Sequence, residues 1–160
     1  AYQFSLGETS YWLEYGNKPL YPFGYGLTYT TFEYGAVQLS DTILSLSGAP
    51  KSIIASCEIT NTGHCDAVAV PQLYIRDVVG SLTRPLRELK GFQRVNIPSG
   101  ETRTVSFEIS EQDLAYWHLA DGVTLGSDGE YAFSAEKGDF HVWIAPNAEE
   151  GQYIPFTLVE

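Results

Sequence analysis

The sequence predicts an all-β protein, a two-sheet antiparallel sandwich, and three observations support this prediction. From about residue 31 onward, short segments alternate apolar with polar residues, which is the period-2 pattern of half-buried strands. Turn-forming residues separate these segments, because the 160-residue chain contains 15 Gly and 8 Pro. No long segment has the 3.6-residue period of an amphipathic helix. Two facing sheets would bury the apolar face that one isolated sheet leaves exposed.

Each predicted strand follows from its own alternation, and turn chemistry lies between neighbours. Strands are expected at residues 31–40 (with a bulge at Gly35), 53–60, 68–75, 86–95, 105–109, 130–136, 139–146 and 153–159. Turns are expected at 61–63, where Asn and Gly tolerate positive φ, and at 98–101. Pro71 marks an edge or a bulge, and Ser110 is placed to cap one short helical turn through Leu114. Seven or eight such strands favour an immunoglobulin-like or fibronectin type III-like architecture.

Charge and hydropathy exclude several classes of partner. The formal net charge is −11, whereas phosphate-backbone binding needs clustered Lys and Arg, so we expect no nucleic-acid partner. An anionic membrane surface is disfavoured for the same reason, and no apolar stretch approaches the roughly 18 residues of a spanning helix. The chain starts at Ala1 and contains no Met, so we expect it to be processed or cut from a longer polypeptide. The compartment stays open, with a secreted or periplasmic one slightly favoured.

The first 30 residues differ from the rest, because they contain nine of the 22 aromatic residues and show no regular period. Gly and Pro interrupt this segment and prevent a regular helix. We therefore expect residues 1–30 to be an irregular docking or linker segment, followed by the sandwich at 31–160. An exposed aromatic surface of this size is unusual on a free monomer. The predicted docking residues are Tyr21, Phe23, Gly24, Tyr25, Gly26 and Tyr29, together with Arg84 and Arg87, which could pair with acids of a partner.

The cysteines and histidines do not form a recognisable metal or nucleophile motif. Cys57 and Cys65 flank a turn, and either a disulfide or a buried free thiol is compatible with that spacing. Together with His64 they lack the close ligand pairs of a zinc site, so we predict no metal and no cofactor. His118 and His141 lie near no nucleophile elbow, so a Ser/His/Asp assignment would be arbitrary.

Paired carboxylates and aromatic platforms are two further kinds of candidate site in this sequence. Glycoside hydrolysis uses two carboxylates about 5–10 Å apart, and the obvious acidic pairs are Glu111 with Asp113 and Glu149 with Glu150. Both pairs fall in polar loops, where acids are usually only solvated, so we predict no catalytic residue. Aromatic rings can instead stack on sugars. The candidate platforms are Tyr11, Trp12 and Tyr15, or Trp117 and Trp143, unless the last two belong to the core.

Several motifs in order resemble those of one known family. The segment PLYPFGYGLTYTTFEY at 19–34 closely resembles the lead-in to the C-terminal fibronectin type III-like domain of family 3 glycoside hydrolases, the β-glucosidase and β-xylosidase group. Segments 60–63, 72–77, 83–92, 98–101 and 138–144 are similar to later signatures of that domain. The resemblance implies a parent enzyme that hydrolyses terminal β-glycosidic bonds and has a barrel domain and an α/β domain before this sandwich. In that family the catalytic residues lie in those two domains, so none carries over to this chain.

The residues and the resemblance together lead to three hypotheses. In the first, the chain is a non-catalytic accessory domain that packs on the barrel and α/β domains of its parent enzyme. In the second, it is a carbohydrate-binding module. In the third, it is a stand-alone protein-interaction module that associates through its aromatic segment.

Overall fold

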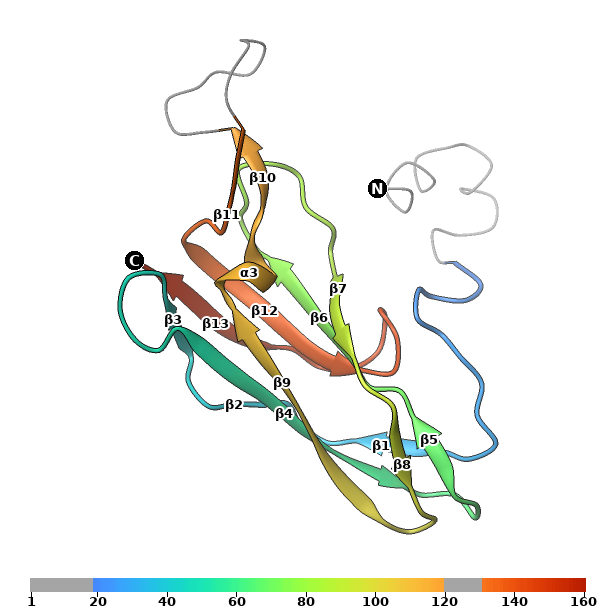
Figure 1. The fold of residues 1–160 in the computed structure, drawn as a ribbon. Helices are drawn as coiled ribbons and strands as arrows, with labels where there is room; N and C mark the ends of the chain where they lie inside the picture. The colour runs from blue at the N-terminus through green and yellow to red at the C-terminus, as the bar shows by residue number, and fades with distance from the viewer. Residues whose placement is uncertain (1–18, 120–130) are drawn as a thin grey trace.

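The computed structural model describes residues 19–119 and 131–160. Within these two ranges the chain forms thirteen strands and one four-residue helix, which confirms the predicted all-β class. Two main sheets pack face to face as a sandwich, and two small two-stranded sheets lie beside them (Figure 1).

The first main sheet is built around the long strand β4 (Ser52–Asn61). It pairs antiparallel with β9 (Thr102–Ser110) along almost its whole length. Its other edge pairs antiparallel with β1 (Phe32–Tyr34) and then with β2 (Gln38–Leu39). Alternate residues of β4 are buried, as the sequence pattern predicted, because only one face of this sheet contacts the core.

The second main sheet has five strands in the order β3, β13, β12, β6, β7. Their bounds are β3 (Ile43–Ser45), β13 (Ile154–Val159), β12 (Gly138–Ala145), β6 (Gln72–Asp77) and β7 (Glu88–Phe92). All neighbours are antiparallel except β3 and β13, which run parallel. The predicted antiparallel sandwich is therefore confirmed with one parallel pair at its edge.

The two small sheets are antiparallel two-stranded ribbons. One pairs β5 (Ala67–Ala69) with β8 (Val95–Ile97), and the other pairs β10 (Tyr116–Leu119) with β11 (Tyr131–Ser134). The β10–β11 ribbon extends beyond one end of the sandwich (Figure 1). The helix α3 (Glu111–Leu114) precedes β10 and is the helical turn expected after Ser110.

Three predicted strands are divided in the structure. Strand 31–40 is interrupted at Gly35, whose amide still donates to the Glu58 carbonyl at 2.8 Å, so β1 and β2 are two short pieces along β4. Strand 68–75 is divided at Pro71, where the chain leaves the β5–β8 sheet and enters the five-stranded one. Pro71 lacks an amide proton and marks a change of sheet rather than a bulge. Strand 86–95 likewise ends at Phe92, and Val95 begins β8.

The main core lies between the two large sheets. The inward residues of β4 and β9 pack against Leu73, Ile75, Val142 and Ile144 of the facing sheet, and the rings of Phe140 and Phe156 stack with centroids 5.4 Å apart. This apolar contact is what stabilises the sandwich.

A second, smaller buried cluster lies outside that core and explains an anomaly in β6. Four consecutive β6 residues, Gln72 to Ile75, are buried, so both faces of this strand are covered. Tyr74 and Trp143 form the outer cluster with Ala145, and Leu89 and Ala148 pack against it. The outer face of the five-stranded sheet is therefore covered at this point by another part of the chain.

Among the residues that the structure describes, no helix has the length and apolar character needed to cross a membrane.

Candidate functional site

The described part of the chain before β1, which starts at residue 19, lies along one flank of the sandwich without helix or strand (Figure 1). Residues 19–30 are called the strap. Its apolar side chains are largely exposed, from 43% for Tyr25 to about full exposure for Tyr29. The exposed set comprises Leu20, Tyr21, Phe23, Tyr25, Leu27 and Tyr29. The strap rings are thus not folded into the interior of the sandwich.

The backbone of the strap, in contrast, is held by buried polar side chains of β6. The Gln72 amide donates to the Gly24 carbonyl at 2.9 Å and to the Pro146 carbonyl at 2.6 Å. The Tyr74 hydroxyl donates to the Gln72 side-chain oxygen at 2.5 Å, which fixes the orientation of the amide. Because Gln72 and Tyr74 are buried, these bonds are shielded from water and hold the strap in place.

A turn at Phe23 and Gly24 brings the strap against this cluster. The Ala148 amide donates to the Phe23 carbonyl at 2.9 Å, and the Tyr25 amide donates to the Pro22 carbonyl at 3.0 Å. Gly24 has φ +80°, and a Cβ at this position would overlap the Gln72 side chain. Gly24 is therefore required both by its conformation and by the close approach of the backbone.

The other end of the strap is tied to the end of β4. The Thr30 hydroxyl donates to Asn61 Oδ1 at 2.6 Å. The side-chain amide nitrogen of Asn61 donates to the Cys65 and Ile97 carbonyls, each at 2.8 Å. Asn61 also accepts from the Gly63 amide at 3.1 Å. Asn61 was predicted as a turn residue but is the last, fully buried residue of β4. The sequence contains a hint of this, because Asn61 continues the inward-facing period of Ile53 to Ile59.

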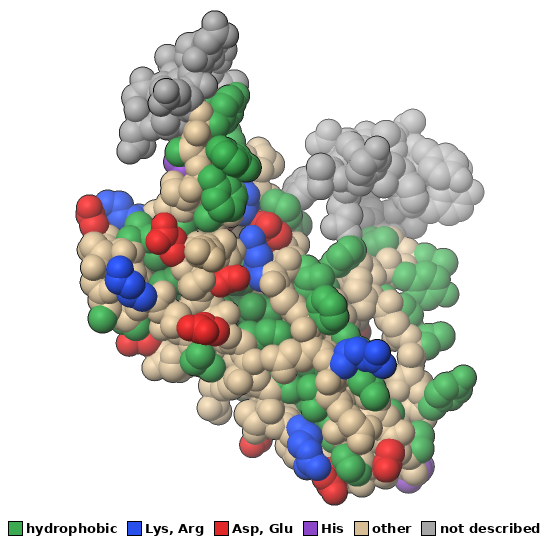
Figure 2. All heavy atoms as spheres, viewed as in Figure 1, with side chains coloured by type: hydrophobic (Ala, Val, Ile, Leu, Met, Phe, Trp, Pro, Cys, Tyr) green, Lys and Arg blue, Asp and Glu red, His purple; other side chains and the backbone are tan. Residues whose placement is uncertain are grey.

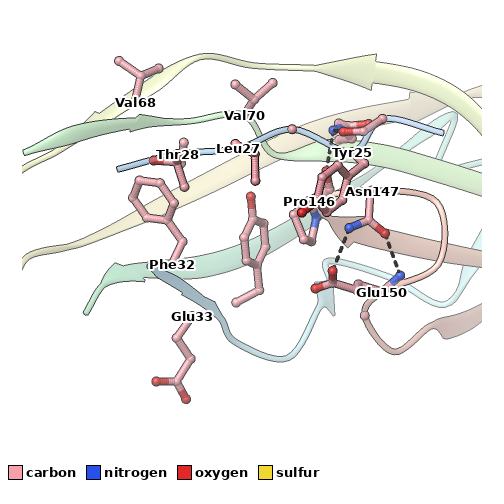
Figure 3. Close-up of a pocket in the computed structure, with 16 residues that line it drawn as sticks. Tyr25, Leu27, Thr28, Phe32, Glu33, Val68, Val70, Pro146, Asn147 and Glu150 are labelled. Atoms are coloured by element: carbon pink, nitrogen blue, oxygen red, sulfur yellow. Dashed lines mark hydrogen bonds between the residues drawn. The ribbon is translucent and has the colours of Figure 1, made fainter. Parts of the chain in front are cut away.

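Between the strap and the edge of the sandwich lies an open groove of about 650 Å³. Figure 3 shows it bounded by the strap on one side and by β1 and the loop after β12 on the other. Phe32 points from β1 toward the strap near Thr28, whereas Glu33 points away. Asn147 closes one end by donating to the Glu150 carboxylate at 2.7 Å. The exposed strap residues and this groove make a mostly apolar surface, and that chemistry suits a protein partner.

The two predicted docking arginines have partners within the domain. Arg84 forms an ion pair with Glu88 at 2.7 Å, and its guanidinium lies 4.0 Å from the Tyr116 ring centroid. Arg87 lies 4.4 Å from the Trp143 ring centroid and donates to the Glu150 carbonyl at 2.6 Å. Burial lowers the pKa of the Arg87 guanidinium. Both arginines therefore help to order the loop before β7, and a contact with an acid of a partner stays a proposal.

The cysteines and histidines that the sequence offered for metal binding or catalysis do not form a common site in the structure. Cys57 is buried and Cys65 exposed, both as free thiols, and burial raises the pKa of the Cys57 thiol. Within the described ranges no three of His, Cys, Asp and Glu lie together as metal ligands. His118 hydrogen-bonds Ser134 at 2.8 Å, and His141 stacks on the Tyr153 ring with centroids 3.8 Å apart.

The paired acids have structural contacts rather than a shared cleft. The Asp113 carboxylate accepts from the Ser110 amide at 2.8 Å and from its hydroxyl at 2.9 Å, which caps α3. The Glu150 carboxylate accepts from Asn147 within the loop after β12. Glu111 and Glu149 are exposed. These contacts satisfy the carboxylates locally.

The two candidate tryptophans have opposite environments. Trp143 is buried beneath Arg87 in the outer cluster, which agrees with the alternative that this residue belongs to the core. Trp117, in contrast, is 64% exposed on β10 beside Phe133. The pair therefore forms no common sugar platform. Tyr11, Trp12 and Tyr15 lie outside the described residues, so the first platform stays a prediction.

Comparison with known proteins places this architecture in a family. Residues 69–148 match the family model of the fibronectin type III-like domain. The chain belongs to the fibronectin type III-like domain family. The matched span runs from the end of β5 through β12.

The relatives of this fibronectin type III-like domain are larger proteins. It is 37% identical over 151 residues to the periplasmic β-glucosidase of Salmonella typhimurium, covering 94% of this chain and 18% of the relative. It is 40% identical over 133 residues to a putative β-xylosidase of Formosa agariphila, covering 81% of this chain and 17% of the relative. The resemblance of its motifs to the C-terminal domain of family 3 glycoside hydrolases is confirmed by these matches.

Solved structures agree in fold. The β-glucosidase of Listeria innocua in complex with isofagomine superposes with a TM-score of 0.77 at 28% identity, covering 96% of this chain and 19% of that chain. A β-glucosidase of Erythrobacter marinus gives a TM-score of 0.74 at 36% identity, covering 89% of this chain and 17% of that chain. The fibronectin type III-like domain thus spans less than a fifth of the length of these relatives.

Proposed function

We propose that this chain is a non-catalytic accessory domain of a family 3 glycoside hydrolase that cleaves terminal β-glycosidic bonds. In this proposal, residues 1–30 form the docking segment and residues 31–160 the sandwich. The strap and the groove beside it pack on the catalytic barrel and α/β domains, and the fibronectin type III-like domain stabilises them. The two relatives that match 94% and 81% of this chain are named a periplasmic β-glucosidase and a putative β-xylosidase.

The observation that carries the proposal is the contrast between the backbone and the side chains of the strap. Buried Gln72 and Tyr74 hold the backbone in one conformation, while the apolar side chains point outward and are exposed. Because the backbone of the strap is already ordered, a partner that covers these side chains need not order the backbone as well, which lowers the entropic cost of docking. Tyr and Phe in particular contribute large contact areas with few rotatable bonds.

The test places this chain in a host enzyme. In the chimera, residues 1–160 replace the matching segment of the Salmonella typhimurium periplasmic β-glucosidase, and hydrolysis of an aryl β-glucoside and the melting temperature are measured. We expect an active chimera, an inactive and less stable host when the segment is deleted, and no hydrolysis by the 160-residue chain alone. Chimeras with Tyr21→Ser and Phe23→Ser should melt several degrees lower than the unmodified chimera. The control Ile54→Ser should have little effect on the melting temperature, because Ile54 lies on the outer face of β4.

Two outcomes would contradict the proposal. Hydrolysis by the isolated chain, retained after repurification, would contradict a non-catalytic role. Equal melting temperatures for the strap variants and Ile54→Ser would contradict docking through the strap. A change in Trp fluorescence of the isolated chain on titration with cello- or xylo-oligosaccharides would favour the carbohydrate-binding alternative. Concentration-dependent sedimentation would favour a self-associating module.

A further inference from the structure

The β10–β11 ribbon has an apolar face that no part of the described chain covers. Trp117 pairs directly with Phe133 across the ribbon, and Leu119 pairs with Tyr131, so these four side chains share one face. Trp117, Tyr131 and Phe133 are each more than half exposed. Figure 2 shows hydrophobic side chains gathered over this ribbon where it extends from the sandwich.

The opposite face of the ribbon is polar and turned inward. The Tyr116 hydroxyl donates to the Glu136 carboxylate, which also accepts from the Ser81 amide at 2.9 Å, and His118 bonds Ser134. Tyr116 and His118 are buried. Three large aromatic side chains are thus exposed on a ribbon whose inner face buries polar groups, so the outward aromatic face requires an explanation.

The geometry of the rings favours a protein partner over a sugar. The Trp117 and Phe133 rings are tilted by 51° with centroids 5.4 Å apart, so they do not form one flat platform for pyranose rings. Among the four described side chains of this face, only the Trp117 indole and the Tyr131 hydroxyl carry a polar atom, whereas small-molecule sites place several polar groups around an apolar surface.

The ribbon face is too small to hold a partner by itself. Three aromatic side chains that are about 60% exposed offer on the order of 300–450 Å², whereas a stable interface needs about 800 Å² from each partner. Adding the six exposed strap side chains brings the total to about 1,000 Å². This comparison argues against a dimer through the ribbon alone and for a surface that includes the strap.

A continuous series of contacts joins the strap to the ribbon. Phe23 contacts the loop after β12 through the Ala148 amide, and that loop accepts a bond from Arg87 through the Glu150 carbonyl. Arg87 lies in the loop before β7, whose Arg84 packs over the Tyr116 ring of β10. The same loop exposes two apolar side chains, Val79 (80%) and Leu86 (59%), between the strap and the ribbon.

We propose that the apolar face of the β10–β11 ribbon is a second contact of the docking surface, and that the catalytic domains covering the strap also cover Trp117, Tyr131 and Phe133. This inference rests on the proposed function, since it names a further part of the surface that faces the same partner. Figure 2 shows hydrophobic side chains both on the ribbon and along the strap on a single face of the molecule.

The test compares the 160-residue chain with the chimera by hydroxyl-radical footprinting read by mass spectrometry. We expect Trp117 and Phe133 to be oxidised about fivefold more slowly in the chimera than in the isolated chain, as Tyr21 and Phe23 should be, because a partner excludes solvent from these rings. Ile54 should be oxidised at the same rate in both. The combined variant Trp117→Ser and Phe133→Ser should lower the melting temperature of the chimera and leave that of the isolated chain unchanged.

The outcomes separate this inference from the proposed function. Protection of the strap without the ribbon overturns the inference and leaves the proposed function intact. If neither the strap nor the ribbon is protected, the inference and the proposed function are both overturned. Both are also overturned if the chimera fails to fold in the Salmonella typhimurium host and in a second host made from the Formosa agariphila β-xylosidase. Concentration-dependent protection of Trp117 in the isolated chain indicates a second copy as the partner and overturns the inference. An equal loss of stability in chain and chimera makes the ribbon residues structural and also overturns it.

Discussion

The Thr30 hydroxyl donates a hydrogen bond of 2.6 Å to Oδ1 of Asn61, which joins the end of the strap to the last residue of β4. Asn61 is fully buried, and its amide also donates to two backbone carbonyls, those of Cys65 and Ile97. One side chain thus fixes the strap, the turn after β4 and the end of β8 relative to one another. Because the site is buried, any of these groups left without a partner would carry its full desolvation penalty.

Replacing Asn61 should therefore destabilise the whole domain. We expect Asn61→Ala to lower the free energy of unfolding by about 2–4 kcal/mol, because several buried polar groups lose their partner at once. Urea denaturation followed by fluorescence measures this change. The matched variant Thr60→Ala removes an exposed side-chain bond to Thr102 and should change the free energy of unfolding by less than about 1 kcal/mol. Equal effects of the two variants would contradict the role assigned to Asn61.

The two neighbouring glycines of the strap should respond differently to the same substitution. Gly24 has φ +80° and would place a Cβ against Gln72 and Tyr74, whereas a Cβ at Gly26 would meet nothing within 4 Å. We expect Gly24→Ala to destabilise the packed strap by about 1–3 kcal/mol. Faster hydrogen exchange of the Ala148 amide, which bonds the Phe23 carbonyl, would report release of the strap. Gly26→Ala should leave that exchange rate unchanged, and a similar increase in both variants would contradict the steric argument.

Much of the sandwich could be predicted from the sequence, because the alternation of apolar and polar residues indicates which face of a strand is buried. The strand around Ile53 to Ile59 and the helical turn after Ser110 were predicted on local patterns alone and occur in the structure. β3 and β10 were missed. β3 has three residues and pairs in parallel with a strand far along the chain, and neither property leaves a local pattern. Tertiary pairing, not propensity, makes such short segments strands.

The candidate site could be predicted only in part. The aromatic content of the strap indicated a surface to be covered; Tyr21, Phe23 and Tyr29 are exposed, and their covering by a partner stays a prediction. The residues that hold the strap, Gln72 and Tyr74, were not predicted, because they face outward from a sheet that is usually solvated on that side. Their function depends on a segment almost 50 residues earlier in the chain, since Gly24 and Gln72 are 48 residues apart.

The two cysteines should differ in reactivity in the folded domain. Cys57 is 2% exposed, its thiol donates to the Gly35 carbonyl at 3.2 Å, and burial raises its pKa, so little reactive thiolate is accessible. Cys65 is exposed. We expect a disulfide exchange reagent to titrate one thiol per native chain rapidly and the second only after unfolding. The variant Cys65→Ser should abolish the rapid phase, and a chain that shows no free thiol even when unfolded would contradict the free-thiol assignment.

Acid should weaken the contact between the ribbon and the sandwich through Glu136. Partial burial by itself would raise the pKa of this carboxyl, but the hydrogen bonds from the Tyr116 hydroxyl and the Ser81 amide outweigh burial and hold the pKa below its ordinary value of 4.5. A carboxyl with a lowered pKa in the folded state stabilises the fold fully above its ordinary pKa. That contribution is lost as the pH falls below 4.5 through the lowered value, because the folded state must then take up the proton.

The variant Glu136→Gln isolates this effect, because it removes the charge and keeps the shape of the side chain. At neutral pH we expect the variant to be less stable than the parent by about 1 kcal/mol, since a charge-assisted hydrogen bond to Tyr116 becomes a neutral one. The difference in free energy of unfolding should shrink as the pH falls below 4.5 and through the lowered pKa, where the parent carboxyl becomes neutral as well. Urea denaturation from pH 7 to pH 3 measures it, with the exposed Glu33→Gln as the control. A difference that stays constant over this range would show that shape, and not charge, determines the contribution of Glu136.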